Sequence, residues 1–503
     1  MKYSFCCPLV ESHFQLNNLQ TEIEFMLKNK NIRIIKRLTH TYKIKMNNME
    51  NDNLNSISAE LTASSGATST TYRKPTSPSG APLSAISPKL FPLPLSDSFK
   101  HYWDKKTLEA AQHELLSTLP FYPESSADHS SKVLRYESPN SLVFPDINEF
   151  HIKPKRNVKN DKHLVFIHGY GAGLGFFIKN IEKISKEHPD WHIHAIDLPG
   201  YGCSTRVTFP SRIPFQNYET VEKLFTVPLR DWFVSRGLDE KNTVVVAHSM
   251  GGYLSLALQL HEVQGTNYIG ESEYENIKSR FSVFGSKKAK ELNTKHENQM
   301  KELTNTSANP RRFWNTLILV SPGGIWSKRT PSIAEESTPT WFVKLWNQNI
   351  SPFSVVRNLG PLGSYLVSGW TSRRFAIDHL FDNSLKKLMH QYSYTIFNAK
   401  GSGEYMLNYL LAAGAVPRHP MFDRLEKLKS YSGKTVWMYG THDWMDYTGG
   451  IKSAEKLNQI SHGSSTVELV PDAGHHIYLD AFDKFNELVG KEMNGFEKVL
   501  SKK

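Results

Sequence analysis

The chain has 503 residues, of which 39% are hydrophobic and 12% aromatic, enough for one large core. No apolar run is long enough to cross a membrane and the mean hydropathy is −0.45, so the sequence predicts at most a peripheral membrane contact. The formal charge of +11 favours acidic partners, either anionic lipid surfaces or nucleic acid, and three cysteines are too few for a disulfide framework.

The first part of the chain differs in composition from the rest. Between Glu24 and Glu50 there is no acidic residue, whereas seven lysines and arginines are interleaved with apolar residues. This pattern is typical of a mitochondrial presequence. The alternatives are a solvated basic tail, or an untranslated extension upstream of a true start at Met46 or Met49. Residues 51–98 are rich in Ser, Thr, Asn and Pro, so residues 1–98 are expected to be a disordered extension. A mitochondrial, peripheral membrane location is expected, with the cytoplasm or a lipid droplet as the alternative.

From His101 onward the pattern becomes globular, with short β-branched strands that end in turn residues. Helical stretches lie between the strands, notably at residues 217–237 and 251–263. This alternation predicts an α/β fold with a mostly parallel sheet covered by helices on both faces, whose chemistry gathers at the carboxyl ends of the strands. The predicted strands cover residues 163–169, 191–202, 242–252, 315–324, 434–443 and 465–476.

Two excursions interrupt this alternation. Residues 265–312 are highly charged and predict a surface insertion within the first part of the core, residues 99–324. Residues 325–424 are aromatic-rich and mostly helical, and their place between two strands predicts a cap over the strand ends, before the second part of the core at 425–503.

The aromatic residues of the predicted cap suit an acyl chain, although most are expected to pack within the cap itself. The paired Arg373 and Arg374 would either meet a phosphate group or form a solvated face. The aromatic set is Trp341, Phe342, Trp346, Phe353, Tyr365, Trp370, Phe375 and Phe381.

Ser249 lies in VVVAHSMGGYL, where a buried strand runs into a sharp turn and then a helix. A nucleophile elbow exposes its serine on such a strained turn, and small residues must flank the serine because strand and helix approach closely. Gly251 meets that need, and Ala247 adds only one methyl group. The alternative is an ordinary serine in a Gly-rich turn, but the pattern favours a nucleophile.

A nucleophilic serine needs a base, and the base needs an orienting acid, in the chain order Ser, Asp, His. Asp443 follows one predicted strand directly and His475 follows the next. Asp446 and His476 are the competing acid and base. We expect Asp443 and His475 to act because each stands in the turn that points toward the serine.

The Gly-rich segment HGYGAGLG (168–175) follows the first clear strand, where backbone N–H groups can approach a ligand. Tyr170 or Gly171 would supply one N–H of an oxyanion hole, and Met250 would supply the other. No G-x-x-x-x-G-K-S/T pattern is present, so a nucleotide site is not expected, and the predicted chemistry requires neither a metal nor a cofactor.

These motifs together, with DLPGYGCS (197–204) and GHHIYLD (474–480), resemble an α/β-hydrolase. They are most similar to abhydrolase-domain-containing proteins four and five and to the fungal cardiolipin-specific deacylases. NAKGSGEYMLNYL and PRHPM (398–421) resemble the cap of that group. The resemblance covers about residue 98 to the C-terminus and does not include the N-terminal extension.

The resemblance implies a serine-dependent phospholipid acyl hydrolase that acts on cardiolipin or a related glycerophospholipid at a membrane or lipid-droplet surface. His475 and Asp480 match an H-x-x-x-x-D motif that the resemblance associates with lysophosphatidic acid acyltransfer, in which acyl-CoA would be the donor. Some relatives lack the serine and are co-activators of another lipase, so a non-enzymatic lipid-surface protein is a further alternative. Nucleic acid is not an expected partner.

Overall fold

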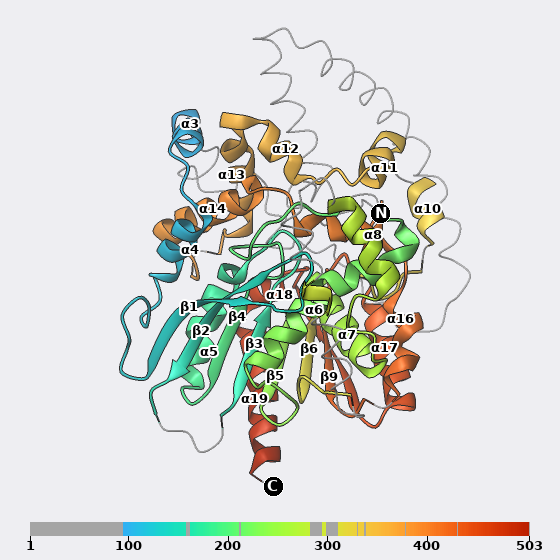
Figure 1. Cartoon of the computed structure of the whole chain (residues 1–503). Helices are drawn as coiled ribbons and strands as arrows, with labels where there is room; N and C mark the ends of the chain where they lie inside the picture. The colour runs from blue at the N-terminus through green and yellow to red at the C-terminus, as the bar shows by residue number, and fades with distance from the viewer. Residues whose placement is uncertain are drawn as a thin grey trace, which may run out of the picture. The chain divides into compact units, whose positions relative to one another are not determined.

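The computed structural model describes residues 94–156, 161–210, 213–281, 294–297, 310–328, 330–336, 339–377, 379–429 and 431–501 (Figure 1). The predicted presequence and the Ser/Thr-rich segment up to residue 93 lie outside these residues. Within the described part of the chain, no helix is both long and apolar enough to cross a bilayer.

Eight strands form one sheet in the order β1-β2-β4-β3-β5-β6-β9-β10 (Figure 1). All neighbours from β4 to β10 pair in parallel, whereas β2 pairs antiparallel with both β1 and β4. The predicted α/β fold with a mostly parallel sheet is therefore confirmed. The strands are β1 (His129–Glu137), β2 (Asp146–Pro154), β3 (His163–Ile167), β4 (His192–Ile196), β5 (Thr243–His248), β6 (Thr316–Val320), β9 (Lys434–Gly440) and β10 (Ser464–Val470).

The antiparallel strands β1 and β2 are the part of the sheet that the sequence analysis missed. In β1 only His129 is buried, so no apolar run marks the strand. β2 is almost wholly buried but carries Asp146, Asn148 and Glu149 at buried positions. Polar residues inside a strand hide the hydrophobic pattern from which strands are read.

Helices cover both faces of the sheet, and every residue of β3, β4, β5 and β6 is buried, as expected for strands covered on both sides. One group of helices packs with the strands into a single large apolar cluster. A second group, whose two helices contact each other, covers the opposite face (Figure 1). The first group is α6 (Tyr218–Ser235), α7 (Met250–Val263) and α17 (Tyr447–Ile460), and the second is α5 (Ile178–Glu187) and α19 (Phe482–Leu500).

The cap leaves the core after β6 and returns before β9. Its first and last segments are joined by backbone hydrogen bonds, from Met421 N–H to Gly324 O at 3.0 Å and from Phe422 N–H to Ile325 O at 3.1 Å. The cap therefore sits on a paired stem. Its elements are α10 (Pro331–Glu336), α11 (Thr340–Asn347), α12 (Phe353–Asn358), η6 (Gly360–Leu362), α13 (Gly363–Arg374), α14 (Asn383–Asn398), η7 (Gly403–Met406), α15 (Leu407–Leu410), β7 (Leu411–Ala412), β8 (Val416–Pro417), α16 (Met421–Arg424) and η8 (Leu425–Leu428).

The expected boundary of the N-terminal extension at residue 98 was too late. Helix α3 (Leu95–Trp103) begins before it, and α4 (Leu108–Leu116) follows. Ser98 is buried, and its hydroxyl donates a hydrogen bond to Pro361 O at 2.6 Å. Helix α3 packs on α13 and α4 packs on α14, so the cap includes a segment that precedes the core in the chain.

The predicted charged surface insertion at residues 265–312 also contributes to the core in its first part. Helix α8 (Glu271–Phe281) buries Tyr274 and Ile277 in the main apolar cluster. Glu273 accepts hydrogen bonds from Thr220 at 2.8 Å and Lys223 at 2.9 Å on α6. The sequence analysis did not recognise this packing, because only a narrow face of α8 is apolar and the rest of the segment is charged.

Candidate active site

Ser249 occupies a strained turn between β5 and α7. Its φ of 52° and ψ of −116° lie in a region that residues with a side chain rarely adopt. The turn is held because the Ser249 N–H donates to Val320 O of β6 at 2.9 Å. A Cβ at Gly251 would lie 2.5 Å from His168 O, so this place tolerates only glycine. The predicted elbow geometry is present.

Ser249, His475 and Asp443 form one hydrogen-bonded line. Ser249 Oγ lies 3.0 Å from His475 Nε2, and His475 Nδ1 lies 3.0 Å from Asp443 Oδ1. A carboxylate only accepts hydrogen bonds, so Nδ1 carries the imidazole proton and Nε2 is available to accept the serine hydroxyl proton. The Asp443 and His475 side chains are buried, which shields the line from water.

The geometry separates the two competing residues from this line. Asp446 Oδ1 accepts a hydrogen bond from Thr448 N–H at 3.1 Å and so caps the first turn of α17. His476 is buried with its ring 5.2 Å from that of His248, and burial lowers its pKa well below the usual value. Neither side chain is joined to Ser249 by a hydrogen bond in the described structure.

The predicted oxyanion loop lies against the serine. A Cβ at Gly169 would lie 2.8 Å from Ser249 Cβ, so the loop after β3 passes directly over the elbow. Met250 is the first residue of α7, and its N–H is among those that a helix leaves without an intrahelical partner. Gly171 has a φ of +67°, and the Tyr170 ring stacks on Phe353 of α12 at 5.2 Å. The same loop therefore joins the site to the cap.

Three residues of the site were missed by the sequence analysis. A Cβ at Gly323 would lie 3.9 Å from Ser249 Oγ and 4.0 Å from Met445 Sδ, and the Trp444 ring lies 4.7 Å from that of His475. Their only signal in the sequence was their place in the turns that follow β6 and β9, where the carboxyl ends of parallel strands meet.

His248 is a fourth missed residue, although it precedes Ser249 directly. Its Nε2–H donates to the backbone oxygen of His475 at 3.0 Å. Burial lowers the pKa of His248 well below its usual value, so the ring stays neutral. It holds the loop that carries His475 and does not contact the serine hydroxyl through a hydrogen bond.

Asp480, the second residue of the H-x-x-x-x-D motif, has both carboxylate oxygens engaged outside the line from Ser249 to Asp443. Its Oδ1 pairs with Arg374 Nη2 at 3.0 Å, and its Oδ2 accepts the Gly474 N–H at 3.0 Å. Arg374 also donates to His476 O at 3.4 Å. Arg374 is thus neither a solvated residue nor a phosphate contact, because its charge is matched by Asp480. This buried pair joins cap helix α13 to the loop that carries His475.

The aromatic residues of the cap mostly pack within it, as expected. Phe353, Trp370, Phe375 and Phe381 are buried. Phe342, Trp346 and Tyr365 are half-buried, and the Phe342 and Trp346 rings stack at 6.0 Å. The side chain of Trp341 lies outside the described atoms.

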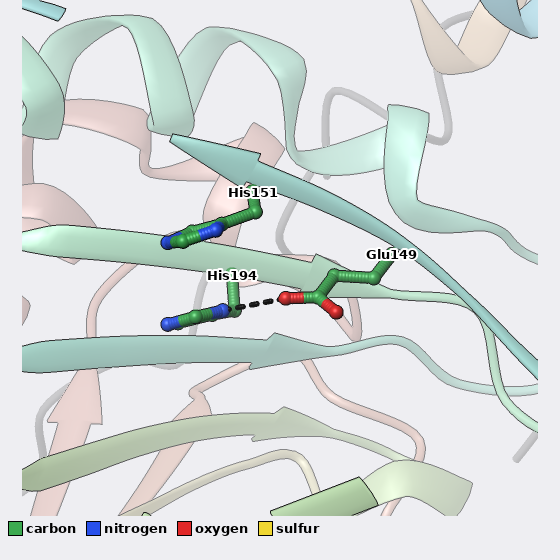
Figure 2. A group of neighbouring side chains, drawn as sticks. All are labelled: Glu149, His151 and His194. Atoms are coloured by element: carbon green, nitrogen blue, oxygen red, sulfur yellow. Dashed lines mark hydrogen bonds and ion pairs between the residues drawn. The ribbon is translucent and has the colours of Figure 1, made fainter. Parts of the chain in front are cut away.

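A second group of titratable side chains lies away from Ser249, on β2 and β4 (Figure 2). Glu149, His151 and His194 place one potential metal-ligand atom each within 4.8 Å of one another. Glu149 already accepts hydrogen bonds from His194 at 2.7 Å and from Arg236 at 2.6 Å. The His151 and His194 rings are stacked at 4.3 Å and 9°, so their in-plane lone pairs run parallel and do not converge. A cation here would also face the Arg236 guanidinium, so we assign no metal to the group.

Acidification is expected to destabilise the fold through three buried histidines of the sheet, His151, His163 and His192. Burial is the first cause that lowers the pKa of His151 to about 3, of His163 to about 2 and of His192 to about 4, from 6.5. Below pH 6.5 the unfolded chain therefore binds protons that the folded chain does not. The free energy of unfolding should fall by about 1.4 kcal/mol per pH unit for each imidazole that stays neutral.

Urea unfolding between about pH 7 and pH 5 measures this effect. His163→Asn should unfold with a shallower pH dependence than the native chain, whereas His462→Asn, at an exposed position, should not change it. Identical slopes for the native chain and His163→Asn would show that the buried histidines are not responsible.

The comparisons agree with the fold. The sequence profile of the Alpha/beta hydrolase family matches residues 164–488. The chain is 28% identical to a 1-acylglycerol-3-phosphate O-acyltransferase of Arabidopsis thaliana, over 63% of this chain and 63% of that protein. It is 25% identical to a (lyso)-N-acylphosphatidylethanolamine lipase of Bos taurus, over 65% and 77%. An abhydrolase domain-containing protein of Caenorhabditis elegans is 26% identical over 66% and 59%.

The chain thus spans less than two thirds of the length of the Arabidopsis and Caenorhabditis proteins. The predicted similarity to abhydrolase-domain-containing proteins is confirmed. The Arabidopsis and Bos taurus relatives act on lipids according to their names. The chain belongs to the alpha/beta hydrolase family.

Proposed function

We propose that the protein is a serine-dependent acyl hydrolase of glycerophospholipids. The observation that carries this proposal is the line from Ser249 Oγ through His475 to Asp443, with both distances at 3.0 Å. This is the geometry of nucleophile, general base and orienting acid. It lies at the carboxyl edge of the sheet beneath a helical cap.

Each step of the reaction has a group to perform it. As Ser249 Oγ bonds to the ester carbonyl carbon, its proton passes to His475 Nε2, and Asp443 stabilises the imidazolium. The N–H groups of Met250 and of Tyr170 or Gly171 would bind the negative carbonyl oxygen. The ester C–O bond then breaks, and His475 protonates the leaving oxygen of the lysolipid. Water, deprotonated by His475, releases the fatty acid and restores the serine.

The lipid class is proposed from the relatives and from charge. The relatives' names specify acylated glycerophosphate and N-acylphosphatidylethanolamine, both anionic lipids. A chain with a net charge of +11 is attracted to such surfaces. Cardiolipin, an anionic glycerophospholipid with two phosphates, is our first candidate because the motifs resemble those of the cardiolipin-specific deacylases.

Acyl transfer to lysophosphatidic acid is the second candidate function, favoured by the name of the Arabidopsis relative. The same acyl-serine intermediate would form, with acyl-CoA as the donor and a lipid hydroxyl in place of water. Hydrolase and transferase would then differ only in which nucleophile enters beneath the cap. A non-enzymatic co-activator is disfavoured because it has no use for an aligned serine, histidine and aspartate.

Mass spectrometry of lipid products distinguishes these functions. Purified protein and Ser249→Ala would be incubated with cardiolipin, phosphatidylcholine, N-acylphosphatidylethanolamine and lysophosphatidic acid, with and without acyl-CoA. Serine-dependent fatty acid and a monolyso product would support the hydrolase and identify its head group. Acyl gain on lysophosphatidic acid without fatty acid would instead make the protein a transferase, and no turnover of any lipid would favour the co-activator.

Asp480→Ala is expected to destabilise the fold by about 3–5 kcal/mol, because it leaves the buried Arg374 without a counter-charge. The Gly474 N–H would also lose its acceptor, so the loop that carries His475 would loosen. Hydrolysis and any acyl transfer should therefore fall together. Thermal unfolding and both activities would be measured on one preparation, with Asp483→Ala, at an exposed position nearby, as the control. Loss of transfer alone, at unchanged stability, would instead assign Asp480 to an acyltransferase site.

We also propose that the protein is addressed to the mitochondrion. The support is the basic, acid-poor composition between Glu24 and Glu50, together with the resemblance to the deacylases. A fluorescent reporter fused after residues 1–60 is expected to enter mitochondria. A reporter that stays in the cytosol would exclude mitochondrial targeting by this segment. The cytoplasm or a lipid droplet would then remain as the location of the protein.

A further inference from the structure

One side chain of the cap lies directly against the proposed oxyanion loop. A Cβ at Gly171 would lie 2.6 Å from Phe353 Cζ, so the tip of this ring packs against the Gly171 backbone. The Tyr170 ring stacks on the same ring at 5.2 Å and 22°. Phe353 is buried and is the first residue of α12. The two residues proposed to supply an N–H to the oxyanion are therefore both in contact with Phe353.

The Gly171 N–H is available to a ligand, but its direction is not fixed by its own segment. The group has no hydrogen-bond partner among the residues that the structure describes. Its φ is +67°, and a glycine adopts positive and negative φ about equally readily. A donor that stabilises a transition state must be oriented before the reaction, because reorientation would cost part of the stabilisation. A contact from outside the segment must therefore hold it.

The rest of the loop is held by hydrogen bonds on both sides of Gly171. Before it, His168 Nδ1–H donates to the backbone oxygen of the next residue at 2.7 Å. After it, Leu174 N–H donates to Asp197 Oδ1 at 2.8 Å. Apart from chain neighbours, the three atoms nearest to a Cβ at Gly171 all belong to the Phe353 ring. Phe353 thus supplies the outside contact at this point of the loop.

An ion pair one helical turn further along α12 holds Phe353 in place. Arg357 Nη2 lies 2.6 Å from Glu404 Oε1, and Arg357 Nη1 lies 3.3 Å from Glu404 Oε2. Residues four apart on a helix share a face, so this pair lies on the side of α12 that carries the ring. Glu404 is buried in η7, and the N–H of Gly403 before it donates to Gly200 O of the core at 3.2 Å. Helix α12 is thereby fastened to the core through η7.

We propose that Phe353 is a positioning residue, which directs the Gly171 N–H toward the reacting carbonyl oxygen and is itself held by Arg357 and Glu404. This inference rests on the proposed function, because an oxyanion forms only if Ser249 attacks an ester. The cap would then complete the oxyanion hole as well as cover it. Without the ring Gly171 could turn, so the transition state would lose a donor while substrate binding would change little.

Kinetics of Phe353→Ala and Phe353→Leu on a soluble short-chain ester test the proposal. Loss of an oxyanion-hole donor costs about 10²- to 10³-fold in kcat, so a misdirected donor should cost about tenfold or more, with KM within about twofold of native. Rates would be expressed per serine labelled by a fluorophosphonate, which removes any loss due to unfolded protein. Phe353→Leu keeps most of the apolar volume and serves if Phe353→Ala does not fold. Phe496→Leu, at a buried position that packs on Trp191, is the matched control and should behave as the native chain does.

An inhibitor and a second substitution identify how Phe353 acts. An alkyl trifluoromethyl ketone places an oxyanion in the hole, so its affinity should fall by the same factor as kcat/KM. Arg357→Lys should lower kcat in the native chain but not further in Phe353→Ala, because Arg357 acts through Phe353. Additive losses would show that the ion pair acts by another route and would remove it from the proposal.

Hydrogen exchange reports on the loop without any turnover. In Phe353→Leu the peptide that covers residues 170–176 should exchange faster, whereas peptides of β5 should exchange as in the native chain. Unchanged exchange of the loop would overturn the proposal, as would a native kcat per labelled serine. A loss confined to KM would also overturn it, since Phe353 would then contact the substrate. A native chain that neither hydrolyses esters nor reacts with the fluorophosphonate would count against the proposed function, and loop exchange would still decide whether Phe353 holds Gly171.

Discussion

Ser249→Ala is expected to lower ester hydrolysis by about 10⁴- to 10⁶-fold, because no other group in the line can form the acyl intermediate. The loss should appear in kcat, since the substitution removes the nucleophile and leaves the cap and its aromatic residues in place. Hydrolysis of a chromogenic ester and of the preferred phospholipid both measure it. The fold should be retained, because the Ser249 backbone N–H still donates to Val320 O.

Ser255→Ala is the matched control for this substitution. Ser255 lies on α7, the helix that follows Ser249, and is buried, but its hydroxyl donates to Gly251 O at 2.8 Å and is not part of the line. It should retain native activity. A fluorophosphonate probe should label the native chain and Ser255→Ala but not Ser249→Ala. Full hydrolysis by a pure Ser249→Ala preparation would refute the assignment of the nucleophile.

Asp443→Asn is expected to lower kcat by about 10⁴-fold. Asparagine can donate a hydrogen bond to His475 Nδ1, which would move the imidazole proton to Nε2 and leave no acceptor for the serine hydroxyl. Activity is therefore lost because His475 adopts the wrong tautomer. The fold is not disturbed, so thermal stability should change little. Steady-state kinetics on the same ester would measure the loss.

Asp446→Asn is the control, three residues further along the chain. Its carboxylate caps α17, and asparagine caps a helix about as well as aspartate, so both activity and stability should be near native. An equal or larger loss in Asp446→Asn would mean that the acid has been assigned to the wrong aspartate.

The sequence by itself determined the class of fold and the place of the nucleophile. The inner strands were readable because a strand covered on both faces must be apolar throughout, as in β3 and β5. The elbow was readable because strain and close packing restrict the residues around Ser249 to small ones. Both features restrict the residue types at consecutive positions, so a short stretch of sequence is enough to recognise them. β1 and β2 could not be read because their buried positions include polar residues whose partners are distant, such as Glu149 and Arg236.

The tertiary structure decided which residues act together. Ser249 and His475 are 226 residues apart, and only the sheet brings them to one edge. Asp443 and Asp446 are chemically identical, and the difference between them is that the start of α17 engages one carboxylate and leaves the other facing His475. The pairing of Asp480 with Arg374 could not be inferred from an H-x-x-x-x-D spacing, because its partner belongs to the cap. A local pattern specifies the conformation of a segment, whereas the direction of a side chain at a site depends on what the rest of the chain packs against it.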